Sequence, residues 1–423
     1  MSVGQGSPEE VLGKKQIHEI VEETLERAGL DGKRVLLLVP DLTRTAPIPM
    51  LFRILSEQIR RRGGALDVMV ALGTHRKLDK KSLCRLVGIT PDEWRRDYPD
   101  IGLLNHDWDE PGVFQMLGHI SAEETRTLSG GLLVESVPIA VNRHALAYEH
   151  LLICGPVFPH EVVGFSGGYK YVFPGIGEQA FIDYSHWLGA LLSSRHVIGK
   201  QDTPVRAAIN RAAAMLPPPV NCLSLVVRQD GALLGLYGGN PVEAQANAAA
   251  LSAQVHIVWL EQPVQRVLAM AAHHYDDLWT AAKAMYKLEP AITDGGEVII
   301  YAPHIDEVSY TYGPLINRLG YHVRDYILAH QSEFEDIPRA VWAHSTHVKG
   351  DGAYEDGMET PRISVTLATG IPEERCRRIG LGYQDPASID PATWLEGQGS
   401  GALVVEKAGE TLYRVREVGS ADV

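Results

Sequence analysis

A histidine, a glycine-rich turn and a lysine stand close together in the segment from residue 155 to residue 176, which reads GPVFPHEVVGFSGGYKYVFPGI. The imidazole of His160 can take up or release a proton near neutral pH. Gly167 and Gly168 allow backbone conformations in which N–H groups approach an anion. Lys170, which follows them, is a candidate nucleophile. The segment therefore predicts a reactive loop, with an ordinary turn and a solvated lysine as the alternative.

Two further polar turns directly follow apolar runs that have the composition of buried strands. The run RVLLLV leads into PDLTR, which brings Asp41, Thr43 and Arg44, and the run LDVMVAL leads into GTHR, which brings His75. A third run, LLIC, leads in the same way into the loop of His160. In open α/β sheets the ligand crevice lies beyond the carboxyl ends of the strands. We therefore expect these polar groups to converge in one cleft.

Taken singly, each of these residues also has a plain structural explanation. Asp41 and Thr43 can cap the next helix, Arg44 can pair with a surface carboxylate, and His75 can be an ordinary loop histidine. His186, in the segment FIDYSHWLG, fits a half-buried histidine on a helix. The remaining histidines show no HExxH or similar metal-binding spacing. The joint placement after successive strands is what favours a functional site.

Alternating apolar runs and helical patterns predict an α/β protein with two domains. The expected strands cover 34–39, 66–72, 151–155, 222–228, 255–260 and 297–302, and the expected helices cover 15–29, 48–62, 276–288 and 308–319. This order is typical of a parallel sheet covered by helices. We expect residues 1–270 to form a doubly wound domain with a parallel sheet, and residues 271–423 to form a smaller α/β domain.

Composition limits the classes of partner. The chain has 423 residues and a formal net charge of −14, so it does not attract nucleic acid or an anionic membrane at long range. The four cysteines form no CxxC pair, which argues against a disulfide framework or a zinc ribbon. The first residues, MSVGQGSPEE, lack the pattern of a signal peptide, and no apolar run is long enough to span a bilayer. We expect a cytoplasmic protein.

These motifs, in this order along the chain, resemble those of the lactate racemase family. The resemblance rests on PDLTR, GTHR, PHEVVGFSGGYKYVFPGI, the histidine at 186 and WTAAKA at 279–284. It implies a nickel-pincer nucleotide as cofactor. In the family pattern Lys170 carries this nucleotide covalently through a thioamide, with Gly167 and Gly168 in the same loop. His186 then supplies the protein ligand to nickel, a metal that the soft pincer donors suit.

The resemblance also implies roles in catalysis and substrate binding. His75 and His160 match the two acid/base histidines, and Arg44 and Lys283 match positions that hold the substrate carboxylate. Asp41 matches an acidic residue near the pyridinium and the substrate. The whole PDLTR turn, with Thr43, lines the same pocket.

The implied reaction is the racemisation or epimerisation of a 2-hydroxy acid by hydride transfer to the cofactor and back. One histidine deprotonates the hydroxyl while the hydride leaves, and the second serves the opposite face. The substrate is a small molecule, and the complexity of the cofactor implies separate maturation enzymes as partners.

This chain departs from the lactate enzymes at positions that bear on the substrate. The lactate-type pattern has a tyrosine and a glutamine where Trp279 and Thr280 stand, and an arginine where Tyr169 stands. Thr280 cannot make the hydrogen bonds of an amide. A different 2-hydroxy acid, such as malate, an aromatic hydroxy acid or a sugar acid, therefore becomes an alternative to lactate.

Two other functional classes are compatible with parts of the sequence. One is a zinc-dependent hydrolase in which His75, His160 and His186 bind the metal, a reading that gives Lys170 no role. The other is a non-catalytic protein that binds a nucleotide or a hydroxy acid. A protein of this kind would not need the two acid/base histidines, His75 and His160.

Overall fold

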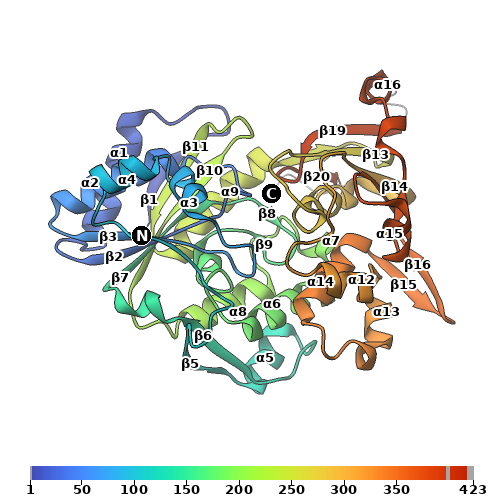
Figure 1. The fold of residues 1–423 in the computed structure, drawn as a ribbon, viewed down its shortest axis with the longest axis horizontal. Coiled ribbons are helices and arrows are strands. Elements are labelled where there is room, and N and C mark those ends of the chain that lie inside the picture. Colours follow the sequence, from blue (N-terminus) through green and yellow to red (C-terminus); the bar gives the residue numbers. More distant parts are fainter. Residues whose placement is uncertain (1, 397–400, 417–423) are drawn as a thin grey trace. The chain divides into compact units, whose positions relative to one another are not determined.

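The structure, a computed structural model, describes residues 2–396 and 401–416 and consists of two compact units (Figure 1). Unit 1 comprises Met1–Phe158, Phe165–Ser185 and Gln201–Val255, and unit 2 comprises Pro159–Gly164, His186–Lys200 and His256–Val423. The α/β fold class expected from the sequence is confirmed in both units.

The units interleave along the chain, whereas the sequence led us to expect one boundary near residue 270. Two short segments of the N-terminal half belong to unit 2. The contacts of the second segment explain this division, because Arg195 Nε donates to Asp351 Oδ2 at 2.8 Å. In addition, the ring of Trp187 lies 5.5 Å from that of Trp342. Such contacts join parts of the chain that no local pattern connects.

Unit 1 is built on a seven-stranded sheet. Its strands, in spatial order, are β1 (Val3–Gly6), β11 (Leu233–Gly239), β10 (Val220–Val227), β7 (His150–Pro156), β2 (Arg34–Val39), β3 (Ala65–Val70) and β4 (Leu103–Asn105). The strands from β10 to β4 pair in parallel, and β11 runs antiparallel to both of its neighbours. The five residues from Val35 to Val39 are all buried, as expected for a parallel strand covered on both faces.

The strand order of unit 1 contains a topological switch point. From β2 the chain moves outward to β3 and β4, and from β7 it moves the other way to β10. Ligands of doubly wound folds bind at the carboxyl ends of the strands where this order reverses. The turn that begins at Asp41 follows β2, and the loop that leads to the glycines follows β7. The fold therefore places both motifs at the position where such proteins bind ligands.

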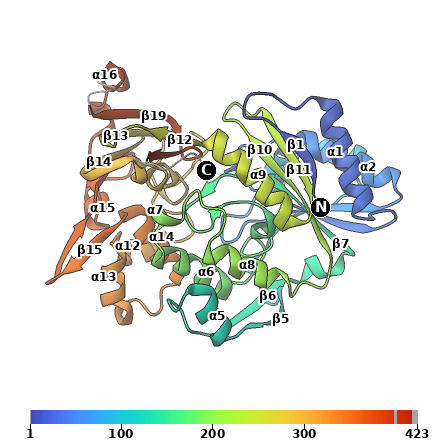
Figure 2. The same ribbon diagram turned by 180° about the vertical axis from the view of Figure 1, so that it is seen from behind.

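Helices cover both faces of this sheet (Figure 2). Helix α1 (Lys14–Arg27) packs over β11 beside α2 (Ile48–Arg61), and α9 (Pro241–His256) lies over the other face. Two glycines of β11 show this directly, because Gly238 touches Thr24 of α1 and Gly235 touches Leu251 of α9. These two glycines are three residues apart, and residues so spaced on a strand point to opposite faces of the sheet. Helices α1 and α9 therefore cover opposite faces.

Unit 2 contains a five-stranded sheet in which every pair is parallel. The order is β18 (Gly382–Tyr383), β17 (Ser364–Thr369), β14 (Ile292–Ala302), β13 (Val264–Ala271) and β19 (Ala402–Ala408). Leu268 and Ile299 form its core with Ala368 and Val404. The residues that follow β13 lead to two short helices, α10 (Leu278–Ala281) and α11 (Lys283–Tyr286), where one helix over 276–288 was expected.

One predicted strand was assigned to the wrong sheet. The run at 255–260 is β12 (Ile257–Leu260), which pairs with β20 (Leu412–Val415) in a separate two-stranded sheet of unit 2. Its side chains explain the difference, because Val258 and Trp259 are exposed and a central parallel strand is buried on both faces. The central strand β13, which we did not predict, begins only four residues later.

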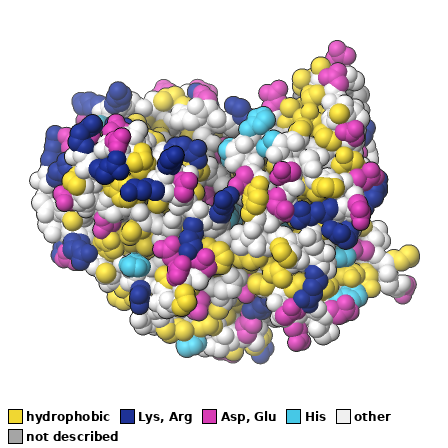
Figure 3. Space-filling model, viewed as in Figure 1, with side chains coloured by type: hydrophobic (Ala, Val, Ile, Leu, Met, Phe, Trp, Pro, Cys, Tyr) yellow, Lys and Arg dark blue, Asp and Glu magenta, His cyan; other side chains and the backbone are white. Residues whose placement is uncertain are grey.

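The surface carries mixed charge. On the face drawn in Figure 3, basic and acidic side chains are interspersed, and no single basic patch dominates. None of the helices within the described ranges is long and apolar enough to cross a membrane.

Candidate active site

The turn after β2 is fixed by the Asp41 carboxylate. Oδ1 of this carboxylate accepts hydrogen bonds from the Thr43 backbone N–H at 3.0 Å and from the Thr43 hydroxyl at 2.6 Å. The other oxygen, Oδ2, lies 2.6 Å from Nδ1 of His75. Asp41 is buried and His75 is half-buried. The side chain of Asp41 thus connects the PDLTR turn with the GTHR turn.

His75 is also held through its backbone. Its N–H donates to the Leu72 carbonyl at 2.9 Å, and its own carbonyl accepts from the indole N–H of Trp108 at 3.1 Å. Gly73, two residues earlier, has a left-handed φ of +58° and donates its N–H to the Gly175 carbonyl at 2.8 Å. This last bond links the GTHR turn to the end of the glycine-rich segment.

The glycine-rich loop needs its glycines. Gly167 has φ +85° and Gly168 has φ +58°, conformations that other residues adopt at a cost. A Cβ on Gly167 would lie only 2.6 Å from Val157 Cγ2. Lys170 follows on a short 3₁₀ helix, η2 (Gly168–Tyr171), and is half-buried. The backbone therefore presents a partly accessible lysine from a rigid turn.

Two side chains hold this loop through its carbonyl groups. Arg206, which is buried on α8 (Pro204–Ala213), donates to the Gly167 carbonyl at 3.0 Å and also to the Phe165 carbonyl. Gln245 Nε2 donates to the Ser166 carbonyl at 3.2 Å. Burial lowers the pKa of Arg206 to about 10, so its guanidinium stays charged at pH 7.

Arg44 lies near the same loop. Loss of hydration raises the pKa of Tyr171, and the nearby positive charge of Arg44 opposes this rise, while the negative charge of Asp41 adds to it. Tyr171 belongs to the helix that carries Lys170. The charges of the PDLTR turn therefore act on the helix that carries the lysine.

His160 belongs to unit 2 and has two neighbours at one ring nitrogen. Its Nδ1 lies 3.2 Å from the Val162 backbone N–H and 3.3 Å from Glu161 Oε2. His160 is buried, with 4% of its surface exposed. Nδ1 can accept the Val162 hydrogen bond only when it carries no proton, and it can donate to Glu161 only when it carries one. The tautomer of His160 thus depends on which neighbour it bonds.

His186 lies on α6 (Gln179–Leu191) and is half-buried. It is the first residue of that helix to belong to unit 2. Burial lowers the pKa of His344 well below its ordinary value, and charge on His347, His186 and Lys283 lowers it further. The region around His186 therefore contains further imidazole groups, and that of His344 is neutral at pH 7.

Two of the residues predicted to bind substrate, Trp279 and Lys283, lie near His344. The ring of Trp279 stacks on that of His344 with centroids 3.8 Å apart. Lys283 is buried, with Nζ 4.9 Å from the centre of the Tyr275 ring. Thr280 is also buried, and its hydroxyl lies within hydrogen-bonding distance of the Asp277 carboxylate at 2.9 Å. The Thr280 hydroxyl is thus engaged in capping α10.

The predicted residues fall into two groups. Unit 1 holds Asp41, Thr43, Arg44, His75, Gly167, Gly168 and Lys170, and unit 2 holds His160, His186, Trp279, Thr280 and Lys283. Within unit 1, direct hydrogen bonds join Asp41 to Thr43 and to His75.

Several residues of these groups were missed. Glu161 stands next to His160 in the sequence, and the pairing of an acid with a histidine was a usable signal. Arg206, His344 and His347 carry no local motif, because only the folded chain brings them to the loop and to His186. A buried arginine or histidine cannot be told from an exposed one by sequence alone.

A metal site made by the protein alone needs several donor side chains close together. In the part of the chain that the structure describes, no three His, Cys, Asp or Glu side chains gather closely enough to hold a metal ion. A zinc site made of three histidines is therefore not favoured. A cofactor that brings most of its own metal ligands needs only one from the protein, and the half-buried imidazole of His186 suits that role.

Similarity to known proteins agrees with the motifs. Residues 5–199 match the family model described as the lactate racemase N-terminal domain. The lactate racemase of Thermoanaerobacterium thermosaccharolyticum is 22% identical over 386 residues, which cover 87% of this chain and 86% of that protein. The lactate racemase of Lactiplantibacillus plantarum is 21% identical over 302 residues, covering 70% of this chain and 66% of that protein.

Solved structures share the fold. A crystal structure of a Thermotoga maritima protein matches with a TM-score of 0.86 and 29% identity, covering 96% of this chain and all (100%) of that one. The lactate racemase apoprotein of Thermoanaerobacterium thermosaccharolyticum matches with a TM-score of 0.71 and 17% identity, covering 95% and 93%. Together with the PDLTR, GTHR and GFSGGYK segments, these matches show that residues 5–199 resemble the lactate racemase N-terminal domain and that the chain shares the fold of a lactate racemase.

Proposed function

We propose that this protein is an isomerase that racemises or epimerises a 2-hydroxy acid, with a nickel-pincer nucleotide attached at Lys170. The observation that carries the proposal is the carboxylate beside each predicted acid/base histidine. Asp41 lies at Nδ1 of His75, and Glu161 lies at Nδ1 of His160. A carboxylate at one ring nitrogen orients the imidazole and leaves the other nitrogen for proton transfer.

The two histidines move the proton of the substrate hydroxyl. In one direction, Nε2 of His75 accepts this proton as the α-carbon loses hydride, which turns the C–O single bond into a carbonyl and gives a 2-oxo acid. When bound, the cofactor supplies the hydride acceptor and later the hydride donor. His160 then gives a proton to the carbonyl oxygen as hydride returns to the opposite face. Protons and electrons balance, because the product has the composition of the substrate.

Arg44 and Lys283 are assigned to the substrate carboxylate. A guanidinium offers a planar pair of donors, and an ammonium adds a point charge. Lys283 is buried, so its charge is little screened by water. These two cations explain how a protein with a net charge of −14 binds an anion.

The residues of the chain fit the proposed cofactor. The rigid turn at Gly167 and Gly168 presents Lys170 with partial exposure, which a covalent attachment requires. His186 is half-buried on a regular helix, which holds an imidazole in a fixed direction. The pair Gly167 and Gly168 would also allow close approach of an anionic group of the nucleotide.

The substrate is proposed to be a 2-hydroxy acid other than lactate. The hydroxyl of Thr280 is engaged with Asp277, so Trp279 remains as the contact from this helix. The indole of Trp279 is half-buried and stacks on the neutral ring of His344. The ring of Tyr312 also lies 4.9 Å from the indole, so the part of Trp279 open to a substrate is aromatic and firmly held, which favours a substrate with a larger side chain than a methyl group.

The test is cofactor loading followed by turnover. Protein co-expressed with pincer-cofactor maturation enzymes is analysed by intact mass and nickel content beside a Lys170→Ala control. We expect a nickel-bearing adduct in the wild type that is absent from the control, and exchange of enantiomers for at least one 2-hydroxy acid in a panel. Unmodified wild-type protein, with a known family member loaded in parallel, would refute the proposal and favour a non-catalytic binding protein.

A further inference from the structure

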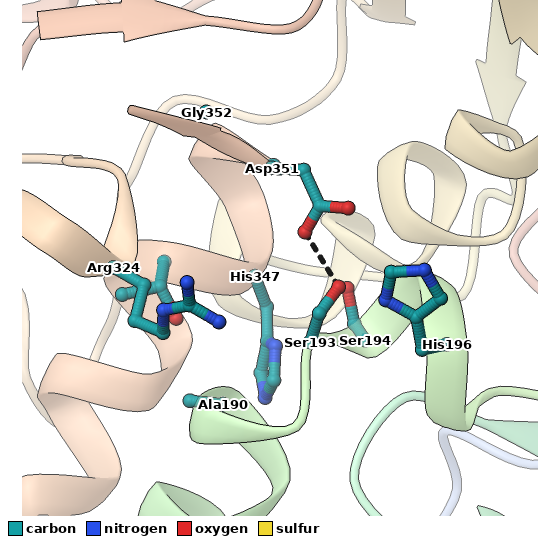
Figure 4. Close-up of a pocket in the computed structure, with 10 residues that line it drawn as sticks. Ala190, Ser193, Ser194, His196, Arg324, His347, Asp351 and Gly352 are labelled. Atoms are coloured by element: carbon teal, nitrogen blue, oxygen red, sulfur yellow. Dashed lines mark hydrogen bonds between the residues drawn. The ribbon is translucent and has the colours of Figure 1, made fainter. Parts of the chain in front are cut away.

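Unit 2 contains a cavity apart from the residues assigned above (Figure 4). Its volume is about 250 Å³. The walls come from the turn between α6 and α7 (Ser194–Val197), the start of α13 (Arg324–Ala329), the end of α14 (Arg339–Lys349) and the start of β15 (Gly352–Glu355). These elements are distant in sequence, and all of them belong to unit 2.

The one carboxylate in the wall is already occupied. Oδ1 of Asp351 accepts from the Ser193 hydroxyl at 2.5 Å, and Oδ2 accepts from Arg195 Nε at 2.8 Å. Ser193 has a left-handed φ of +69°, which a residue other than glycine adopts at a cost. Asp351 therefore holds the turn in place, and its negative charge is balanced by Arg195.

The hydrogen-bonding capacity that remains in the wall is mostly that of donors. His347 is 4% exposed, and its Nε2 has no hydrogen-bond partner among the described residues. Burial lowers the pKa of His347 to about 4, so at pH 7 the ring is neutral and carries one N–H. Figure 4 shows this ring between Arg324 and Ser193, directed toward the end of α6 that carries Ala190.

Ser194 and Arg324 add further donors. The hydroxyl of Ser194 lines the cavity and makes no hydrogen bond to any residue that the structure describes. Arg324 bonds the Leu191 carbonyl at 3.1 Å and pairs with Asp325 at 3.0 Å. A guanidinium has five N–H groups, so these contacts leave others for a ligand. The ring of His347 forms part of the wall, and its Nε2 is closed off from solvent, so the donors open to a ligand are those of Ser194 and Arg324.

We propose that this cavity binds a small oxyanion, a carboxylate or a phosphate, through Arg324 and Ser194, with the neutral ring of His347 in its wall. One cation and one hydroxyl donor match the several acceptor oxygens of such an anion. A cation is disfavoured, because the single carboxylate of the wall is paired. The ligand is small, since the space of about 250 Å³ lies below the range of about 300–1,000 Å³ typical of small-molecule sites.

The test is calorimetric titration of the protein without cofactor, so that its outcome does not depend on the proposed racemase activity. Sodium phosphate and sodium acetate are titrated separately into the wild type, Ser194→Ala and Arg324→Met. Ser332→Ala, which changes an exposed serine of the same unit, is the matched control. Arg44 and Lys283 are unchanged in every variant, so binding of anions by those residues stays constant across the series.

We expect saturable binding of at least one anion, weakened about fivefold in Ser194→Ala and about tenfold or more in Arg324→Met. Ser332→Ala should bind as the wild type does. Binding of acetate alone would identify a carboxylate ligand, and binding of phosphate alone a phosphorylated one. The proposal is overturned if neither anion binds saturably, or if both variants bind as tightly as the wild type. Ser194→Ala removes no hydrogen bond within the described residues, so it keeps the test decisive if Arg324→Met fails to fold.

Discussion

The carboxylate of Asp41 and the imidazole of His75 lie 2.6 Å apart, Oδ2 to Nδ1. The same carboxylate fixes the PDLTR turn through two hydrogen bonds to Thr43. The position of the histidine is therefore tied to the conformation of a turn that follows the neighbouring strand. A small change in either turn would move the ring nitrogen that we propose transfers the proton.

Replacing Asp41 by asparagine tests this connection. An amide is nearly isosteric but can no longer accept from both partners as a carboxylate does, so His75 should lose its orientation and its tautomer. We expect the racemisation rate of the loaded enzyme to fall about 100-fold or more, measured by chiral chromatography. The control is Asp100→Asn, an exposed aspartate of unit 1. A rate near that of the wild type, with normal cofactor content, would exclude this role of Asp41.

Replacing Glu161 by glutamine tests the second histidine. Without the carboxylate, only the Val162 N–H remains as a partner of Nδ1, so the proton stays on Nε2 and His160 can no longer act as the base in the direction in which it must accept a proton. We expect kcat to fall about tenfold or more with KM little changed, and Glu161→Asp to recover part of the loss. If Glu161→Gln and Glu161→Asp lower kcat equally, the effect is one of packing and the assignment fails.

Arg206 supports the loop that carries Lys170. In Arg206→Met the carbonyl groups of Gly167 and Phe165 lose their donor, and a lost partner for a buried polar group costs about 1–3 kcal/mol. Part of this cost is offset because a buried charge is removed, so we expect the free energy of unfolding to fall by about 2 kcal/mol. Denaturant unfolding and the mass of the Lys170 adduct measure the two effects. Arg206→Lys should restore more adduct than Arg206→Met, and equal loading in all three proteins would contradict the role.

Thr280 distinguishes a structural hydroxyl from one that binds substrate. Its hydroxyl and its N–H both bond Asp277, so Thr280→Ser should keep both stability and turnover. Thr280→Val should lower the free energy of unfolding by about 1 kcal/mol and leave KM nearly unchanged, as seen in denaturant unfolding and steady-state kinetics. A KM that rises strongly in Thr280→Val at unchanged stability would instead show that the hydroxyl contacts the substrate.

His347 predicts a loss of stability in acid. Its pKa is about 4 in the folded protein and 6.5 ordinarily, with burial as the main cause and the negative charges of Glu161 and Asp351 opposing it. As the pH falls below about 6.5, the unfolded chain takes up a proton that the folded chain does not. Stability therefore declines between about pH 6.5 and 4, in total by about 3 kcal/mol, since a tenfold change in proton affinity is about 1.4 kcal/mol. The free energy of unfolding of His347→Gln should decline less steeply over this pH range. A slope equal to that of the wild type would contradict this role of His347.

The sequence was sufficient for four of the seven strands of the unit 1 sheet, namely β2, β3, β7 and β10, because parallel strands buried on both faces are nearly pure apolar runs. RVLLLV became β2 with the same bounds, and the polar turns after β2 and β7 lie at the switch point that their position predicted. The same reasoning failed at VHIVWL, where an apolar run forms an exposed edge pair. Apolar composition does not tell a central strand from a peripheral one.

The supporting residues of the site could not be predicted for a related reason. Arg206 bonds a loop 39 residues earlier, and Ser193 bonds a carboxylate 158 residues later. Both contacts depend on tertiary packing between distant parts of the chain, which no short sequence pattern encodes. By contrast, Asp41, His75 and Lys170 lie within motifs whose spacing is local and therefore readable.

The chain passes between the two units repeatedly, and α6 itself contributes to unit 1 up to Ser185 and to unit 2 from His186 onward. Neither unit corresponds to a continuous stretch of the gene. A fragment that ended at residue 255 would retain Lys170 and would also carry two segments whose packing partners it had lost. Neither unit can therefore be produced by itself as one continuous fragment of the chain.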